Sequence, residues 1–301
     1  MTNAQWPTLQ LAGWLETRAT LHMLTQIVGK TRLALAPAQN HWWHVPLYLS
    51  ARGLTTSAIP WGDQALECEF DFVRHAFEIR SSLGQSASIA LSSRPVAHFF
   101  RDYLAALEAF HVTARFLRRP VEVRESIPFA EDLRHRTYDP EWANALWRVL
   151  VRTRNVFERF RGEFKGKASP VHFFWGSFDL AASRFSGRRA PVHPGGAPNC
   201  ADWVMQEAYS HEVSSAGFWP GDESCPEAIF YAYAYPAPRG FEAAPVAPPE
   251  ARWDTTLREF VLPYEPLHLL DNPEEKLLEF LHTTYAAAAT LGNWDRGALE
   301  S

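Results

Sequence analysis

Two long helix-forming segments divide the chain and set its fold class. The first runs from Thr8, a good N-cap residue, to Leu35. The second runs from Asp139-Pro140, an N-cap followed by proline at the first helical position, to about Phe164. Each is followed by short segments rich in β-branched and aromatic residues, which favour strands. We therefore predict an α+β fold in which largely antiparallel sheets, or a partial barrel, are flanked by long helices.

The predicted strands form two groups, one after each long helix. The first group is residues 44–51, 54–59, 65–82 and 86–93, and the second is residues 171–185, 204–215 and 228–236. In the longest strand of the first group, alternation places Asp71 and His75 on one face. A histidine on such a face is either a satisfied core residue or a ligand, so His75 is kept as a site candidate. Two more helices are predicted, over residues 95–110 and 273–291.

The two halves of the chain, residues 1–125 and 139–301, share an order of long helix, aromatic strand, further strands and helix. In a hand alignment, Gly29-Lys30 corresponds to Gly166-Lys167. We hypothesise an internal duplication within a single compact unit of residues 1–301; the alternative is a chance likeness between two α+β halves. A duplication would join the strands into one sheet or partial barrel, with a pocket between the halves.

The charge and the apolar pattern exclude several classes of partner. The formal net charge is −5 and the pI is about 6.2, whereas a nucleic-acid-binding domain normally carries a basic face. No window approaches about 18 uninterrupted apolar residues, and the start, MTNAQWPTLQ, lacks the basic and apolar regions of a signal peptide. The three cysteines have no paired spacing, which fits a reducing compartment. We expect a cytoplasmic protein that binds a small molecule and neither nucleic acid nor a membrane.

One face of the first helix carries His22, Gln26 and Lys30 at helical spacing. Two placements are consistent with this polar stripe. It faces solvent, as lysine and glutamine usually do, or it faces the floor of a pocket.

The stretch from Pro170 to Gly221 concentrates ionisable side chains among aromatic ones, on segments predicted as strands. Its candidates are His172, Asp179, Arg184, Glu207, His211 and Glu212. A ligand pocket requires such a mixture, in which a few polar groups orient the ligand and apolar groups enclose it.

A mononuclear site for a divalent transition metal, Fe, Mn or Zn, is the first hypothesis, with His172, His211 and Glu207 as ligands. On a regular strand Glu207 and His211 would be about 13 Å apart, so this set requires a bend or a helical turn. His211 with Glu212 is the alternative pair, although neighbours on a strand point to opposite faces. Buried, hydrogen-bonded histidines without a metal are the competing interpretation.

The second hypothesis is acid–base catalysis without a metal. The acid and the base would come from one set of side chains: His172, His211, Glu207 and Asp179. Lys30 or Arg184 would hold an anionic group of the substrate. The chain contains no nucleophile elbow, Walker loop, dinucleotide fingerprint or H-E-x-x-H motif, so no established reaction class is indicated.

The third hypothesis is a small-molecule binding protein without turnover. Tyr231, Tyr233 and Tyr235 alternate along one strand face and, with Trp175 and Trp219, would stack a planar or cationic ligand. The competing interpretation is an ordinary half-buried sheet face. The residues expected to contact a ligand are Lys30, Arg184, Trp175, Tyr209 and Tyr233.

Several sequence blocks carry a family resemblance. The longest are NHWWHVPLYLSARGLTT, SPVHFFWGSFDLAASRFSGRRAP and EAYSHEVSSAGFWPG, and they are joined by TLHMLTQIVGK, FDFVRH and FYAYAYPAP. They resemble those of the domain of unknown function 5996 family over nearly the whole chain, from about Trp6 to Trp294. The resemblance implies one integrated unit and brings no catalytic residues with it.

From the ionisable and aromatic residues together, we expect an enzyme that acts on a small polar molecule in an aromatic-lined pocket, with a binding protein as the alternative.

Overall fold

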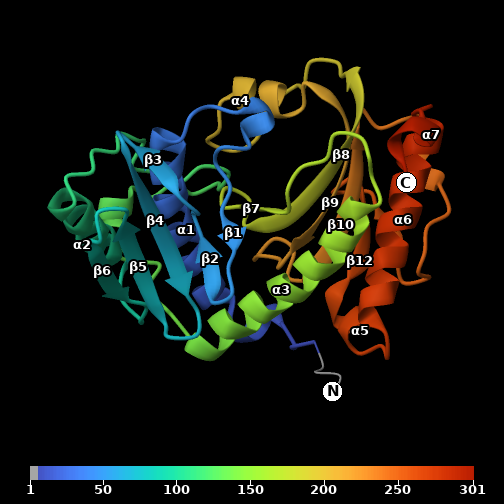
Figure 1. Ribbon diagram of the computed structural model, residues 1–301. Coiled ribbons are helices and arrows are strands. Elements are labelled where there is room, and N and C mark those ends of the chain that lie inside the picture. The colour runs from blue at the N-terminus through green and yellow to red at the C-terminus, as the bar shows by residue number, and fades with distance from the viewer. Residues whose placement is uncertain (1–5) are drawn as a thin grey trace.

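The first long helix, α1 (Leu15–Leu35), lies in the interior of the protein. The structure, a computed structural model, describes residues 6–301 (Figure 1). Fifteen of the 21 residues of α1 are buried, and the helix contacts elements of both halves of the chain. It begins at Leu15 and not directly after Thr8, since residues 11–13 form a separate 3-10 turn.

The first sheet is built from residues 48–90. Its strands are antiparallel in the order β1-β2-β4-β5-β6, and β3 pairs with β4 beside this path. Their bounds are Tyr48–Leu49 (β1), Gly53–Thr55 (β2), Ile59–Trp61 (β3), Gln64–Asp71 (β4), Ala76–Ser81 (β5) and Ser86–Ala90 (β6). Helix α2 (Val96–Ala109) begins after Pro95, as predicted, and packs against α1 and β6. The two helices lie on the same side of this sheet (Figure 1).

The segment 65–82, predicted as one strand, is a hairpin of β4 and β5. Asp71 turns the chain at the end of β4, because its Oδ1 accepts hydrogen bonds from the backbone N–H groups of Val73 (2.9 Å) and Arg74 (2.8 Å). His75 then adopts a φ of 55° in the turn. The prediction that Asp71 and His75 share one strand face is therefore wrong.

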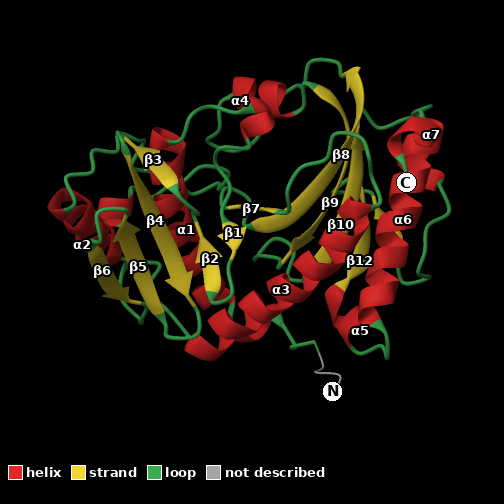
Figure 2. Ribbon diagram, in the orientation of Figure 1, coloured by secondary structure: helices red, strands yellow, loops and turns green. Residues whose placement is uncertain are grey.

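The second sheet follows α3 (Pro140–Gly162), which Asp139 caps as predicted by accepting from the first backbone N–H groups of the helix. Its strands are antiparallel in the order β7-β8-β9-β10-β12-β11. Their bounds are His172–Phe174 (β7), Asp179–Arg189 (β8), His211–Trp219 (β9), Ile229–Tyr235 (β10), Arg252–Asp254 (β11) and Glu259–Pro263 (β12). α3 and α6 (Pro273–Leu291) pack against one face of this sheet (Figure 2), and the short helices α5 (Tyr264–His268) and α7 (Arg296–Leu299) flank α6 along the chain.

The segment 204–215, predicted as one strand, is helical in its first part. Residues Asp202–Ala208 form helix α4, and β9 begins only after that helix has ended. α4 packs on residues 40–42: Nδ1 of His41 lies 2.8 Å from the Ala208 carbonyl oxygen, and the rings of Trp42 and Trp203 have centroids 5.2 Å apart. These contacts with the first half stabilise a helix in a sequence whose alternation alone favours a strand.

The two sheets meet edge to edge at one point. Leu47 and Phe173 exchange two backbone hydrogen bonds of 2.9 Å each, beside β1 and β7. Both sheets remain open, so the α+β class with antiparallel sheets is confirmed, and the strands do not close into a barrel. None of the helices within residues 6–301 is long and apolar enough to cross a membrane.

The two halves follow the same coarse order of long helix, antiparallel meander and helix. One pair of segments aligned between the halves does not occupy equivalent positions in the structure. Gly29-Lys30 lies inside α1, whereas Gly166-Lys167 follows the end of α3. The internal duplication stays a prediction.

Candidate functional site

A cavity of about 800 Å³ lies between the two halves. The first half contributes α1 and the loops around residues 41–45 and 117–122. The second half contributes α4, the loop before it, and one face of the sheet from β7 to β12. Figure 1 shows α4 above the junction of the two sheets. The sequence hypothesis of two related halves places a pocket at this position.

The second sheet presents alternate residues to the cavity. They are Asp179, Ala181, Ser183 and Phe185 of β8, Val213, Ser215 and Trp219 of β9, Ile229, Tyr231 and Tyr233 of β10, and Glu259 of β12. Arg184 is one residue out of phase and points to the opposite face. There its guanidinium lies 3.4 Å from the centroid of the Phe160 ring and donates to the Phe160 carbonyl oxygen. Arg184 therefore lies outside the cavity, where it was predicted to hold the substrate.

The polar stripe of α1 faces the interior, and the solvent-facing alternative is wrong. His22, Gln26 and Lys30 expose 4% of their surface or less. Lys30 lines the cavity. The other two hold its wall: Nε2 of His22 lies 2.8 Å from the Gly176 carbonyl oxygen, and the Gln26 amide bonds the backbone N–H and C=O of Val121 (2.9 and 2.7 Å).

The shortest contact of His22, from Nε2 to the Gly176 carbonyl at 2.8 Å, assigns its tautomer over the 3.2 Å contact of the same nitrogen with the Gln26 amide. The Gly176 carbonyl can only accept, so Nε2 carries the proton and Nδ1 accepts from Arg18 at 3.4 Å. Burial, followed by the charge of Arg18, lowers the pKa of His22 to about 3. His22 is thus a neutral support for the turn between β7 and β8.

Glu122 enters the cavity from a loop to which the sequence assigns no role. Gln26 holds the preceding residue, and the Glu122 N–H donates to the Pro198 carbonyl oxygen at 2.7 Å. Its φ of 58° is uncommon for a residue other than glycine. The carboxylate lies against Gly176, where a Cβ would come within 2.0 Å of Oε1. A glycine is therefore needed at residue 176 for Glu122 to keep this position.

The surroundings of Glu122 shift its pKa toward neutrality. The residue is exposed by surface area, but that surface belongs to the wall of the cavity. Enclosure there, followed by the charge of Asp179, raises the pKa to about 7, and the opposing effect of Lys30 is smaller. Within residues 6–301 the Glu122 carboxylate accepts no hydrogen bond and forms no ion pair.

Asp179 and Glu259 form an acidic pair on the sheet face of the cavity. Ser177 and Tyr231 both donate hydroxyl hydrogen bonds to the Asp179 carboxylate. Tyr231 reaches it by crossing Gly217, where a Cβ would lie 2.2 Å from the hydroxyl oxygen. The Glu259 carboxylate has neither an ion pair nor a hydrogen-bond partner in the described part of the chain. Burial, followed by the charge of Asp179, raises the pKa of Glu259 to about 8, and burial also raises the pKa of Asp179.

Lys30 is the one lysine or arginine among the described residues that line the cavity. It is buried, and its ammonium lies 5.5 Å from the centroid of the Trp175 ring without a hydrogen bond or an ion pair in residues 6–301. Burial lowers its pKa to about 8, against smaller opposing effects of Cys200 and Glu122. The Trp175 ring packs onto α1 at Gly29, where a Cβ would lie 2.3 Å from it.

Aromatic rings form much of the remaining wall. The rings of Tyr231 and Tyr233 are nearly parallel, with centroids 6.0 Å apart, and the hydroxyl oxygens of Tyr209 and Tyr233 are 2.6 Å apart. Four of the five residues predicted to contact a ligand lie in the cavity lining: Lys30, Trp175, Tyr209 and Tyr233.

Several residues of the lining adopt backbone conformations that are uncommon outside glycine. His41, Trp42, Glu122 and Asn199 have φ values of 56°, 62°, 58° and 53°. Such conformations cost free energy and concentrate at functional sites, where the surrounding structure enforces them. Their presence in the loops around this cavity supports its choice as the candidate site.

The residues predicted to bind a metal do not converge. His172 is fully buried beside the ring of Trp43, and neither of its nitrogens has a hydrogen-bond partner among residues 6–301. Burial, followed by the charge of Arg32, lowers its pKa to about 3. Glu207 is exposed at the end of α4, and His211 begins β9 outside the cavity lining. No group of three or more His, Cys, Asp or Glu side chains in residues 6–301 is placed to hold a metal ion.

Two further candidates also lie outside the cavity lining and have partners elsewhere. Glu212 forms an ion pair of 2.7 Å with Arg188. Nδ1 of His75 lies 2.9 Å from the hydroxyl oxygen of Tyr138. These partners explain the positions of Glu212 and His75 without a ligand.

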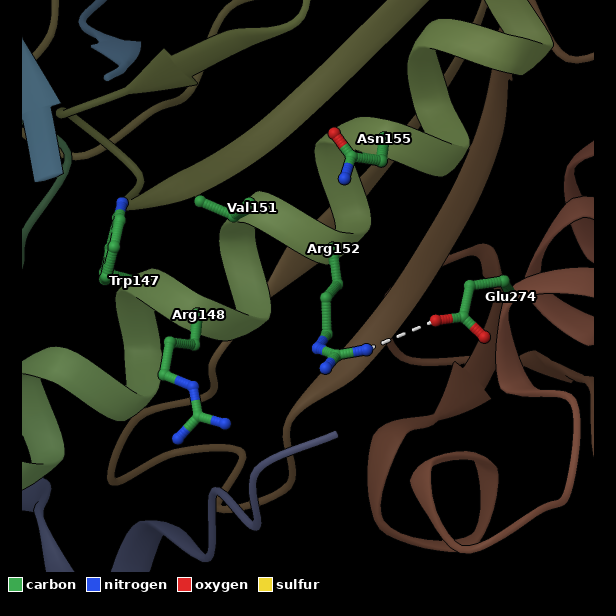
Figure 3. Close-up of a pocket in the computed structure, with 6 residues that line it drawn as sticks. All are labelled: Trp147, Arg148, Val151, Arg152, Asn155 and Glu274. Carbon is green, nitrogen blue, oxygen red and sulfur yellow. Dashed lines mark hydrogen bonds and ion pairs between the residues drawn. The ribbon is translucent and has the colours of Figure 1, made fainter. Parts of the chain in front are cut away.

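A second cavity, of about 390 Å³, lies along α3 (Figure 3). It is lined by Trp147, Arg148, Val151, Arg152 and Asn155 of α3 with Glu274 of α6. Arg152 and Glu274 form an ion pair of 3.4 Å, and Arg148 and Asn155 are exposed. The polar groups of this cavity are paired or reached by solvent, so it is the weaker candidate for a ligand site.

The fold and the site define an α+β protein with two open antiparallel sheets and an aromatic-lined cavity between α1 and one face of the second sheet. A family model described as "Family of unknown function (DUF5996)" matches residues 6–301, and the chain belongs to this family. Comparison with curated proteins and with solved structures gave no match. The resemblance drawn from the sequence blocks is confirmed, and the function has to be argued from the cavity.

Proposed function

We propose that the cavity binds a small polar molecule and that Glu122 and Lys30 exchange protons with it, so that the protein is an enzyme. One observation carries the proposal. The side chains of Lys30, Glu122 and Glu259 line the same cavity, and none of these side chains has an ion pair or a hydrogen bond within residues 6–301. Enclosed ionisable groups are normally paired, because removing a charge from water is costly. A bound molecule with complementary groups would supply the missing partners.

Glu122 and Lys30 are suited to acid–base catalysis. The pKa of Glu122 is about 7 and that of Lys30 is about 8, so both groups change protonation state near neutral pH. General acids and bases are most effective under this condition. The negative charge of Glu122 raises the pKa of Lys30, and the positive charge of Lys30 lowers that of Glu122. One group would accept a proton from the bound molecule while the other donates one.

The proposal uses no metal ion. A mononuclear site would require His172, His211 and Glu207 around one point, and they belong to no such group. A reducing compartment such as the cytoplasm is part of the proposal, since the three cysteines are free thiols.

A binding protein without turnover is the second candidate. It is favoured by the aromatic wall, in which the stacked rings of Tyr231 and Tyr233 and the indole of Trp175 offer faces for a flat or cationic ligand.

The test is a binding and turnover assay with mixtures of polar metabolites. Native mass spectrometry identifies the bound molecules, and chromatography with mass spectrometry detects products. Ala181→Trp places a large ring in the cavity and should abolish binding, whereas Arg148→Ala, in the smaller cavity along α3, should not. Binding that survives Ala181→Trp would contradict the proposed site.

The same assay separates the two candidate functions. Turnover that is lost in Glu122→Gln and Lys30→Met, with binding retained, is the result expected of the enzyme. Binding without any product in the wild-type protein would favour the second candidate.

A further inference from the structure

We infer that the molecule bound in the cavity is an organic amine, with its ammonium group beside Glu259 and an apolar body directed toward the opening. The inference rests on the proposed function, because it assigns a ligand class to the same cavity. The charge of the lining, the surroundings of Glu259 and the character of the opening support it.

The cavity is lined by three carboxyl groups and by one amine. Glu122, Asp179 and Glu259 stand against Lys30, and Arg184 points to the opposite face of the sheet. If all four were ionised, three negative charges and one positive charge would leave the lining with a net charge of −2. A cationic ligand offsets this charge, whereas an anionic ligand adds to the repulsion.

Of the three carboxyl groups, Glu259 has the fewest hydrogen bonds and positive charges near it to offset a negative charge. Asp179 accepts two hydroxyl hydrogen bonds, and Glu122 is influenced by the positive charge of Lys30. The charges that act on Glu259 are those of Asp179 and Asp254, and both are negative. An ammonium group beside Glu259 would therefore supply the partner that the protein itself does not provide.

Tyrosine rings lie next to Glu259 on the same face. Ala232 pairs with Phe260 in the ladder of β10 and β12, so Tyr233 and Glu259 are the next opposed residues. The ring of Tyr231 stacks on that of Tyr233, with an angle of 16° between the two planes. Aromatic faces attract ammonium groups electrostatically. A carboxylate and ring faces at one place favour an amine over a neutral hydroxyl group.

Three large apolar side chains lie at the opening of the cavity. Leu117, Trp203 and Leu257 belong to the lining and expose 63%, 54% and 38% of their surface, so they stand where the cavity meets solvent. Large apolar side chains gathered at an exposed site mark a binding surface. Leu257 also precedes Glu259 closely in the chain. The apolar body of an amine bound at Glu259 would contact these side chains.

Binding of an ammonium group should release protons from the cavity. The ionisable groups around Glu259 and Glu122 are Asp179 of β8, Tyr231 and Tyr233 of β10, Asp254 of β11, Tyr209 after α4, Cys200 before α4, and Lys30 of α1. Glu122, Glu259 and Lys30 titrate nearest to neutral pH. Each makes the cavity more negative when it loses its proton, so the affinity for the amine should rise between about pH 6 and about pH 8.

The test compares three probes of similar shape by calorimetry on the full chain: phenethylamine, phenethyl alcohol and hydrocinnamate. We expect the amine to bind at least about ten-fold more tightly than the alcohol, and the carboxylate to bind most weakly. Glu259→Gln should weaken binding of the amine about ten-fold and leave that of the alcohol unchanged. Glu250→Gln removes an exposed carboxylate outside the cavity lining and should change neither.

Two results would overturn the inference: hydrocinnamate binding as tightly as the amine, or a preference for the amine that survives Glu259→Gln. In either case, loss of binding in Ala181→Trp would still support the proposed function, so the two failures are distinguishable. If none of the three probes binds, the ligand class is wrong, and the metabolite screen decides the function of the cavity separately.

Discussion

The hydroxyl group of Tyr231 on β10 donates a hydrogen bond to the carboxylate of Asp179 on β8, across the intervening strand β9. The ring can follow this path because residue 217 of β9 is glycine. The bond ties together two strands that carry the acidic part of the cavity. It also provides a partner for a buried carboxylate that has no ion pair within residues 6–301.

Gly217→Ala should destabilise the protein by about 1–3 kcal/mol, because the new methyl group and the Tyr231 ring cannot occupy the same space. Urea denaturation measures the free energy of unfolding. Tyr231→Phe is the matched control, since it removes the hydroxyl group and keeps the ring, and it should cost about 1 kcal/mol. A Gly217→Ala protein as stable as the wild type would contradict the observed path of the ring.

Glu259→Gln should stabilise the protein at alkaline pH. The pKa of Glu259 is about 8 in the folded protein against an ordinary value of 4.5, so the folded state retains the proton between these values. The stabilisation from this proton is present below pH 4.5 and is lost as the pH rises to about 8. The variant should therefore match the wild type near pH 4.5 and exceed it above pH 8 by at most about 5 kcal/mol.

Urea denaturation at several pH values measures this difference, with Glu250→Gln as the exposed control. A difference between Glu259→Gln and the wild type that does not change with pH would show that Glu259 titrates like an ordinary glutamate.

Two buried histidines should respond differently to the same substitution. His172→Phe should cost little or stabilise the protein, because both ring nitrogens lack a partner among residues 6–301 and the neighbours are aromatic. His22→Phe should cost about 1–3 kcal/mol, because it removes the donor to the Gly176 carbonyl. Equal losses in unfolding free energy would contradict the structural roles assigned to the two residues.

The alternation of side chains along a strand excludes one pair of the predicted site residues from a common cavity. Asp179 and Arg184 lie an odd number of residues apart on β8, so a regular strand cannot present both to one cavity. The sequence did not determine which of the two faces inward, because that depends on which face α3 covers. The same reasoning applies to the stripe of α1. The spacing of the stripe is visible in the sequence. Whether the stripe faces solvent or the interior depends on a long-range contact, the packing of Trp175 of the second half onto Gly29.

Glu122 and Glu259 carried no local signal. Glu122 lies in the short segment VEVRE and Glu259 in LREFV, and both segments resemble many surface segments. Both enter the site through contacts with distant parts of the chain: the bond from Gln26 to the residue before Glu122, and the pairing of β12 with β10. The helix α4 was missed for a similar reason, since its docking on His41 and Trp42 is a long-range contact.

The titration of Lys30 tests the central claim, that unpaired ionisable groups are enclosed in one cavity. The chain has four lysines, so methylation of the amines with carbon-13 gives a simple spectrum that can be followed against pH by NMR. We predict that one resonance, absent from Lys30→Met, titrates near pH 8, because burial disfavours its charged form. A Lys30 resonance that titrates at the ordinary lysine value of 10.5 would place the amine in water or in an ion pair and would contradict the claim.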